Sequence, residues 1–107
     1  MKTIITSTGP YVEALYDLRF GRCQFLCILD ENTWKTEFVE NKFSEWKEGA
    51  GAALAQEILL LGIEKIISGD FGPFAQDILK ENNIQMVVFP EKNKTVDEII
   101  QFIKIKR

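Results

Sequence analysis

Residues 66–75 read IISGDFGPFA, which combines the end of a strand, a tight turn and the start of a helix. The apolar residues predict a buried strand, and Pro73 suits the first helical position because its missing N–H has no intrahelical partner there. Gly69 and Gly72 flank the turn, where glycine permits positive φ and the close approach of a ligand. Ligands of open α/β sheets usually bind at such turns, at the carboxyl ends of strands. The stretch therefore predicts an α/β fold and the place of a site.

The chain on either side of this stretch divides into short strands and amphipathic helices. The predicted strands are apolar or alternating runs bounded by turn residues, at residues 2–7, 23–29, 34–40, 64–68 and 84–89. The predicted helices carry an apolar face with a 3.6-residue period, at residues 49–61, 73–81 and from 95 onward. The last helix begins with a capping box at residues 95–98, and the second is expected to turn Phe74, Ile78 and Leu79 inward. Residues 11–20 are compatible with a short helical turn or a ligand loop.

This order of elements has one economical assembly. Three strands form an antiparallel meander, and two right-handed crossovers add strands parallel to the first. We therefore expect one domain over residues 1–107, with a mixed five-stranded sheet of order 3-2-1-4-5, an antiparallel second strand and three helices.

In that topology the glycines converge on one edge of the sheet. The chain has seven glycines, and only Gly62 falls on the opposite edge, where it is expected to end a helix in the left-handed conformation. The other glycines share one rim, at positions Gly9, Gly21, Gly49, Gly51, Gly69 and Gly72. This concentration is better explained by a ligand cleft than by turn chemistry alone.

The predicted cleft favours an anion. Helix starts at Gly51 and Pro73 direct unpaired backbone N–H groups and positive dipole ends into it. Arg19 and Arg22 can donate in pairs to an anionic group, although pairing of both with acidic neighbours such as Asp17 is an alternative. Cys23 follows Arg22, where we expect a lowered thiol pKa.

Composition narrows the classes of function. The net charge is −3 and no basic stripe is present, which argues against a nucleic-acid or anionic-membrane partner. No apolar run approaches the roughly 18 residues that span a bilayer, and the start of the chain is too soon polar for a signal peptide, so a cytoplasmic location is expected.

The chain has no histidine and only two cysteines. Cys23 and Cys27 would lie about 13 Å apart in a strand, which argues against a disulfide or a shared zinc site. Two buried, reduced thiols in a core strand are the alternative to a functional role for either cysteine.

Four turns together resemble one family. They are Arg19-Phe20-Gly21-Arg22, Gly49-Ala50-Gly51, Gly69-Asp70-Phe71-Gly72-Pro73 and Thr95-Val96-Asp97-Glu98. Their order and spacing are similar to those of the dinitrogenase iron-molybdenum cofactor-binding family, over essentially the whole chain. Its members include nitrogenase accessory factors and small stand-alone proteins, and this chain resembles the stand-alone kind.

The resemblance implies a ribonuclease H-like three-layer fold. It also implies noncovalent binding or carriage of an anionic metal–sulfur cluster, such as an iron-molybdenum cofactor or a molybdenum, iron or copper–sulfur cluster, with donor and acceptor proteins as partners. Many members have histidine before the Gly-Ala-Gly turn, where this chain has Lys47 and Glu48. Direct metal ligation would therefore fall to Cys23, and less readily to Asp70. The cofactor-binding residues predicted from the rim and the resemblance are Thr8, Gly9, Arg19, Gly21, Arg22, Cys23, Gly49, Ala50, Gly51, Gly69, Asp70, Phe71, Gly72 and Pro73.

Other functions remain open. A noncatalytic module that binds a nucleotide or another phosphorylated ligand would use the same N–H groups, although no Walker-type Gly-Lys-Ser/Thr follows the turns. A two-metal phosphoesterase needs converging carboxylates, and residues 2–7 supply none, so we expect no catalysis. A protein–protein role would use Phe43 and Trp46 near the rim.

Overall fold

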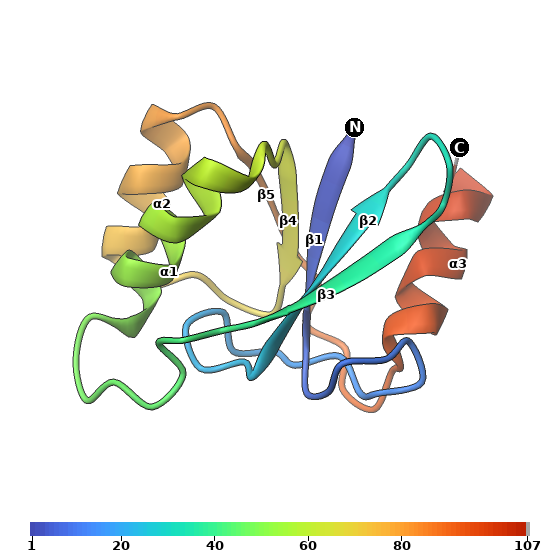
Figure 1. The fold of residues 1–107 in the computed structure, drawn as a ribbon, viewed down its shortest axis with the longest axis horizontal. Helices are drawn as coiled ribbons and strands as arrows, with labels where there is room; N and C mark the ends of the chain where they lie inside the picture. Colours follow the sequence, from blue (N-terminus) through green and yellow to red (C-terminus); the bar gives the residue numbers. More distant parts are fainter. Residues whose placement is uncertain (107) are drawn as a thin grey trace.

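The computed structural model describes residues 1–106 of the chain. Its elements follow the predicted order (Figure 1). In sequence they are β1 (Lys2–Ser7), β2 (Phe25–Asp30), β3 (Thr36–Glu40), α1 (Ala50–Ile58) with a 3₁₀ turn η1 (Leu59–Leu61), β4 (Lys65–Ser68), α2 (Pro73–Glu81), β5 (Gln85–Val88) and α3 (Val96–Lys106).

The strands form one mixed sheet between two layers of helix. The strand order is β3-β2-β1-β4-β5, with β2 antiparallel to both its neighbours and β4 and β5 parallel to β1. Helices α1 and α2 cover one face and α3 covers the other (Figure 1). The predicted α/β three-layer fold, strand order and antiparallel second strand are confirmed.

The core is divided by the sheet into two apolar clusters. Neighbouring residues of a strand point to opposite faces, so Ile4 and Ile66 pack under α1 and α2, whereas Ile5 and Ile67 pack under α3. All four residues are buried, and burial of each such side chain contributes about 1.5–3 kcal/mol. The near-continuous apolar strands are therefore explained by helices on both faces.

Strand β2 begins at Phe25, two residues later than predicted. The chain turns before Phe25, so the alternation expected from Cys23 to Cys27 does not apply. Cys23 packs in the cluster under α1 and α2, and Cys27 packs in the cluster under α3. The two thiols therefore lie on opposite faces of the sheet rather than on one face.

The inward orientation predicted for Phe74 is wrong. Its side chain is 75% exposed, and Ala75 and Leu79 are the buried residues of α2. The buried face of α2 is therefore narrower than the pattern indicated, because Ala75 and not Phe74 packs in the core from the first turn of the helix. The ambiguous residues 11–20 form a loop, joined to β1 through a Ser7–Tyr16 bridge and to the start of α3 through a Leu15–Thr95 bridge.

The caps predicted for two helices are present. Gly62 ends η1 with a φ of 68°. At the start of α3, the Glu98 N–H donates to the Thr95 hydroxyl at 3.1 Å and the Thr95 N–H donates to the Glu98 carboxylate at 2.9 Å. The capping box therefore satisfies two N–H groups that the helix itself leaves unpaired.

Loss of this box should destabilise the protein measurably. We expect Thr95→Ala to lower the free energy of unfolding in urea by about 1 kcal/mol, the usual cost of removing an N-cap hydroxyl. Glu98→Gln is the control, because an amide oxygen can still accept from the Thr95 N–H. No loss of stability in Thr95→Ala would contradict the role of the box, and a loss in Glu98→Gln would show that the charge of Glu98 contributes as well.

Candidate functional site

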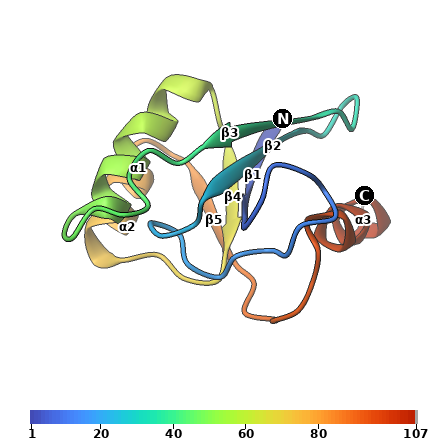
Figure 2. The same cartoon turned by 60° about the horizontal axis from the view of Figure 1, so that its bottom comes forward.

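A cleft of about 380 Å³ opens at the carboxyl edge of the sheet, where α1 and α2 begin. Figure 2 brings this edge forward and shows the loops that precede β2, α1 and α2 lying beside one another. Most of the predicted site residues line this glycine cleft. Its lining residues are Gly21, Arg22, Gly49, Ala50, Gly51, Ala52, Asp70, Phe71, Gly72, Pro73, Phe74 and Ala75.

Five predicted residues lie outside the glycine cleft. Thr8 and Arg19 line a separate shallow pocket with Tyr16. Gly9 packs beside Ala14, Gly69 packs beside Leu18, and Cys23 lies in the core. The cleft is therefore a smaller site than the glycine rim predicted.

Two glycines of the rim are required by packing between segments of the chain. A Cβ atom at Gly21 would lie 2.7 Å from the backbone nitrogen of Gly51, and one at Gly69 would lie 2.5 Å from Cβ of Leu18. Separations this short are steric clashes, so any side chain would push these segments apart. The concentration of glycines at this edge thus has two causes, close backbone packing and an open cleft.

Other glycines do face open space. A Cβ atom at Gly49 or Gly72 would meet nothing within 4 Å, and one at Gly51 would make only ordinary contact with Ala75 at 3.8 Å. Gly49 has a φ of 75°, which a side chain rarely adopts. Gly72 has ordinary extended dihedrals, with a φ of −64° and a ψ of 160°, so its lack of a side chain keeps the cleft open without being needed for the backbone.

Both helices that begin at the cleft lack the usual side-chain caps. Gly49 and Gly72 are the N-cap residues of α1 and α2, and neither helix has a side-chain cap hydrogen bond or an acidic residue in its first turn. The first intrahelical bonds run from Ala53 to Gly49 and from Gln76 to Gly72. The N–H groups at the first positions of both helices are therefore available to an anion, supported by the positive ends of two helix dipoles.

The two arginines hold loops in place. Arg19 makes an ion pair of 3.1 Å with Asp17, whose side chain is buried. Arg22 lines the cleft, but its guanidinium donates to the carbonyl oxygens of Ser44, Trp46 and Lys47. The alternative of a structural ion pair with Asp17 is thus confirmed for Arg19, whereas Arg22 fixes the segment that leads into α1.

Asn41 is a positioning residue that the sequence did not single out. It is buried, and its amide nitrogen donates to the carbonyl oxygens of Gly21 at 3.0 Å and Cys23 at 2.8 Å. Its amide oxygen accepts from the Phe43 N–H at 3.0 Å. Asn41 therefore connects the loop before β2 to the segment after β3. The sequence did not reveal this role, because an asparagine directly after a strand is typical of an ordinary turn.

The lowered thiol pKa predicted for Cys23 is wrong. The residue is fully buried, and its Sγ donates to the carbonyl oxygen of Phe20 at 3.2 Å. Burial raises the pKa of this thiol to about 12, and the negative charge of Asp17 adds to the effect. The thiol is therefore protonated at neutral pH and does not reach the cleft.

The cleft has an aromatic floor and one carboxylate. Phe71 lines the cleft, and its ring packs against that of the buried Phe20 with the centroids 5.1 Å apart. The carboxylate of the exposed Asp70 accepts from the Phe20 N–H at 3.4 Å. Across residues 1–106, no three cysteine, aspartate or glutamate side chains come together in a group that could hold a metal ion. The uncapped helix starts are the groups of the cleft that suit an anion.

Comparison with solved structures supports the fold. The apo form of the orange protein from Desulfovibrio gigas superposes with a TM-score of 0.88 at 27% identity, covering 98% of this chain and 88% of that one. The NMR structure of a Thermotoga protein, described as a candidate NifB protein of the DUF35 family, has a TM-score of 0.82 at 27% identity and covers 99% of this chain and 89% of that one. None of the curated protein sequences compared with the chain matches it.

Comparison with protein families matches nearly the whole chain. The family described as dinitrogenase iron-molybdenum cofactor matches residues 1–104, and these residues include all the turns that carried the resemblance. Residues 1–106 contain no helix that is both long and apolar enough to cross a membrane. Because the family model matches residues 1–104, the chain belongs to the dinitrogenase iron-molybdenum cofactor family.

Proposed function

We propose that the protein binds and carries an anionic metal–sulfur cluster in the glycine cleft. The observation that carries the proposal is that two uncapped helices, α1 and α2, begin at one cleft with no acidic residue in either first turn. A sulfur-bridged cluster with net negative charge can accept hydrogen bonds from these N–H groups through its sulfur atoms. Membership of a family described by the iron-molybdenum cofactor supports this cargo over other anions.

The proposed contacts come from the backbone. The first-turn N–H groups of α1, at Ala50, Gly51 and Ala52, would donate from one wall of the cleft, and those of Phe74 and Ala75 would donate from the other. Backbone donors fixed by two helices need no reorganisation to bind, which limits the entropic cost of association. Noncovalent retention of this kind also suits a carrier, because release breaks no metal–protein bond.

Carriage implies proteins that deliver and accept the cluster. Two exposed aromatic residues are connected to the cleft, namely Phe74 and Trp46. Phe74 lines the cleft directly, and the Trp46 carbonyl oxygen accepts from Arg22, which also lines the cleft. Exposed aromatic residues are enriched where proteins dock, and we include these two rings in the surface that would meet a donor or an acceptor.

Gly72→Asp tests the proposal without disturbing the fold. An aspartate N-cap would occupy the N–H groups of α2 and bring a negative charge into the cleft, while its backbone dihedrals and free space accommodate it. We expect the unfolding free energy to stay equal or rise by a few tenths of a kcal/mol. Anaerobic titration with tetrathiomolybdate, followed by its visible absorbance and by molybdenum content after desalting, should show binding to the unmodified protein and at least a tenfold loss in the variant.

Asn83→Asp is the matched control, since it adds the same charge at the far end of α2, where Asn83 already has a φ of 58°. Its binding should equal that of the unmodified protein. Failure of the unmodified protein to retain any molybdenum, together with anaerobically purified protein free of molybdenum, iron and copper, would refute cluster carriage. Retention of phosphate or ADP in preference to tetrathiomolybdate would instead establish the phosphorylated-ligand alternative.

Paired cysteine variants test whether a thiol takes part. Because Cys23 and Cys27 are both buried, we expect Cys23→Ser and Cys27→Ser to retain tetrathiomolybdate equally when compared at the same folded fraction. Selective loss of binding in Cys23→Ser, with the fold intact by circular dichroism, would restore the predicted role of Cys23 as a metal ligand.

A further inference from the structure

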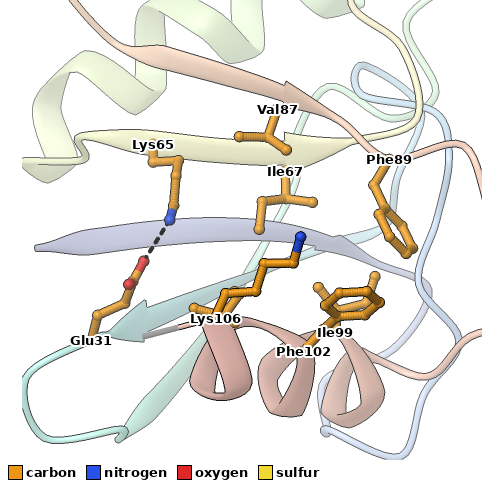
Figure 3. Close-up of a pocket in the computed structure, with 9 residues that line it drawn as sticks. Glu31, Lys65, Ile67, Val87, Phe89, Ile99, Phe102 and Lys106 are labelled. Atoms are coloured by element: carbon orange, nitrogen blue, oxygen red, sulfur yellow. Dashed lines mark ion pairs between the residues drawn. The ribbon is translucent and has the colours of Figure 1, made fainter.

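A second groove, of about 420 Å³, lies between the sheet and α3. It is on the opposite face of the sheet from α1 and α2, so it is separate from the glycine cleft (Figures 1 and 3). It runs along β4, from Lys65 at the start of that strand toward Phe89, which follows the end of β5 (Figure 3). The lining residues of this α3 groove are Glu31, Lys65, Ile67, Val87, Phe89, Ile99, Phe102, Ile103 and Lys106.

Most of the α3 groove is apolar. Ile67 and Val87 supply the strand side, and the ring of Phe89, just after β5, stands edge to face with that of Phe102 on α3 at a centroid distance of 5.9 Å (Figure 3). Phe102 remains 46% exposed, so an aromatic ring is left open to solvent at the mouth. A largely apolar cavity of a few hundred Å³ with a few fixed polar groups is typical of a small-molecule site.

The polar groups of the groove give it a positive balance. Glu31 is buried, and its carboxylate is 3.0 Å from the Lys65 ammonium and accepts from the Thr3 hydroxyl at 2.5 Å. The Glu31 charge is therefore already compensated inside the protein. Lys106 adds a second ammonium, which lies 5.4 Å from the Phe102 ring centroid and extends over the groove (Figure 3). Two ammonium groups against one carboxylate favour a ligand with one negative charge.

We propose that the α3 groove binds a small amphiphilic anion, with an aromatic or otherwise apolar body and a single acidic head group. The body lies between Ile67, Val87 and the two phenylalanine rings, and the head group meets Lys106, with Lys65 as the next nearest cation. Charge complementarity and the apolar lining together select this class. A bare inorganic anion would leave the apolar surface uncovered, and a neutral apolar molecule would leave Lys106 without a charged partner in the ligand.

The probe is 8-anilinonaphthalene-1-sulfonate, an aromatic sulfonate whose fluorescence rises in apolar sites. Titration of the native protein should give saturable binding at one site. Lys106→Glu should weaken that binding about tenfold, since it replaces an attraction by a repulsion at the head group. Lys104→Glu is the matched control, with the same change of charge on the same helix but a side chain that lies over Trp34, outside the groove. Its affinity should be unchanged.

A second pair of variants guards against nonspecific binding of the dye. Val87→Trp fills the groove and should abolish the saturable signal, whereas Leu60→Ser removes an apolar side chain that is 81% exposed elsewhere and should leave the signal intact. Gly72→Asp should also leave dye binding intact. Loss of dye binding in the α3 groove can therefore be told apart from loss of cluster binding in the glycine cleft.

Three results would overturn the inference. One is equal affinity in Lys106→Glu and Lys104→Glu, and another is equal affinity for the neutral analogue N-phenyl-1-naphthylamine. The third is loss of dye binding as the protein dimerises with rising concentration, which would assign the groove to a second copy of the chain.

Discussion

The close packing of the loop before β2 against the helix starts is the constraint on which the rest of the site depends. Gly21 lies directly against the backbone of Gly51, and Gly69 lies directly against Leu18, at separations that exclude any Cβ atom. These two contacts bring three segments that are far apart in the sequence to one edge of the sheet. Asn41 and Arg22 then fix the fourth segment, residues 41–49, through hydrogen bonds to backbone carbonyls. The walls of the cleft are thus mainly backbone segments, which are fixed by close packing and by hydrogen bonds to their carbonyl oxygens.

This construction explains why the site carries so little side-chain chemistry. Two helices begin there without caps, and the nearest thiol is buried and protonated. Among residues 1–106 every buried side-chain nitrogen or oxygen already has a hydrogen-bond partner. At the cleft, the first-turn N–H groups of α1 and α2 have no intrahelical partner, and such groups suit an anion and are poor ligands for a bare metal ion. This combination fits the proposed cargo, because a preformed cluster brings its own metal–sulfur bonds.

The fold and much of the site could be predicted from the sequence because both depend on local signals. Apolar runs, the Pro73 helix start and the capping box at Thr95 each have a mechanism that acts within a few residues. The strand order followed from the right-handedness of crossover connections and from the order of the elements. It placed most of the glycines correctly, at the carboxyl edge of the sheet. What could not be predicted depended on packing between distant segments. Cys23 packs in the core cluster under α1 and α2, and Phe74 lines the cleft although its spacing fits the apolar face of α2. The roles of Gly21 and Gly69 are visible only once their neighbours across the loop are known.

Backbone amide shifts measured by two-dimensional NMR, before and after anaerobic addition of tetrathiomolybdate, would show which part of the protein binds the anion. We expect the largest changes at the first-turn amides of α1 and α2, namely Ala50, Gly51, Ala52, Phe74 and Ala75, with little change at residues that line the α3 groove. Changes centred on Cys23 and Cys27, or on the α3 groove, with the helix starts unaffected, would contradict this expectation.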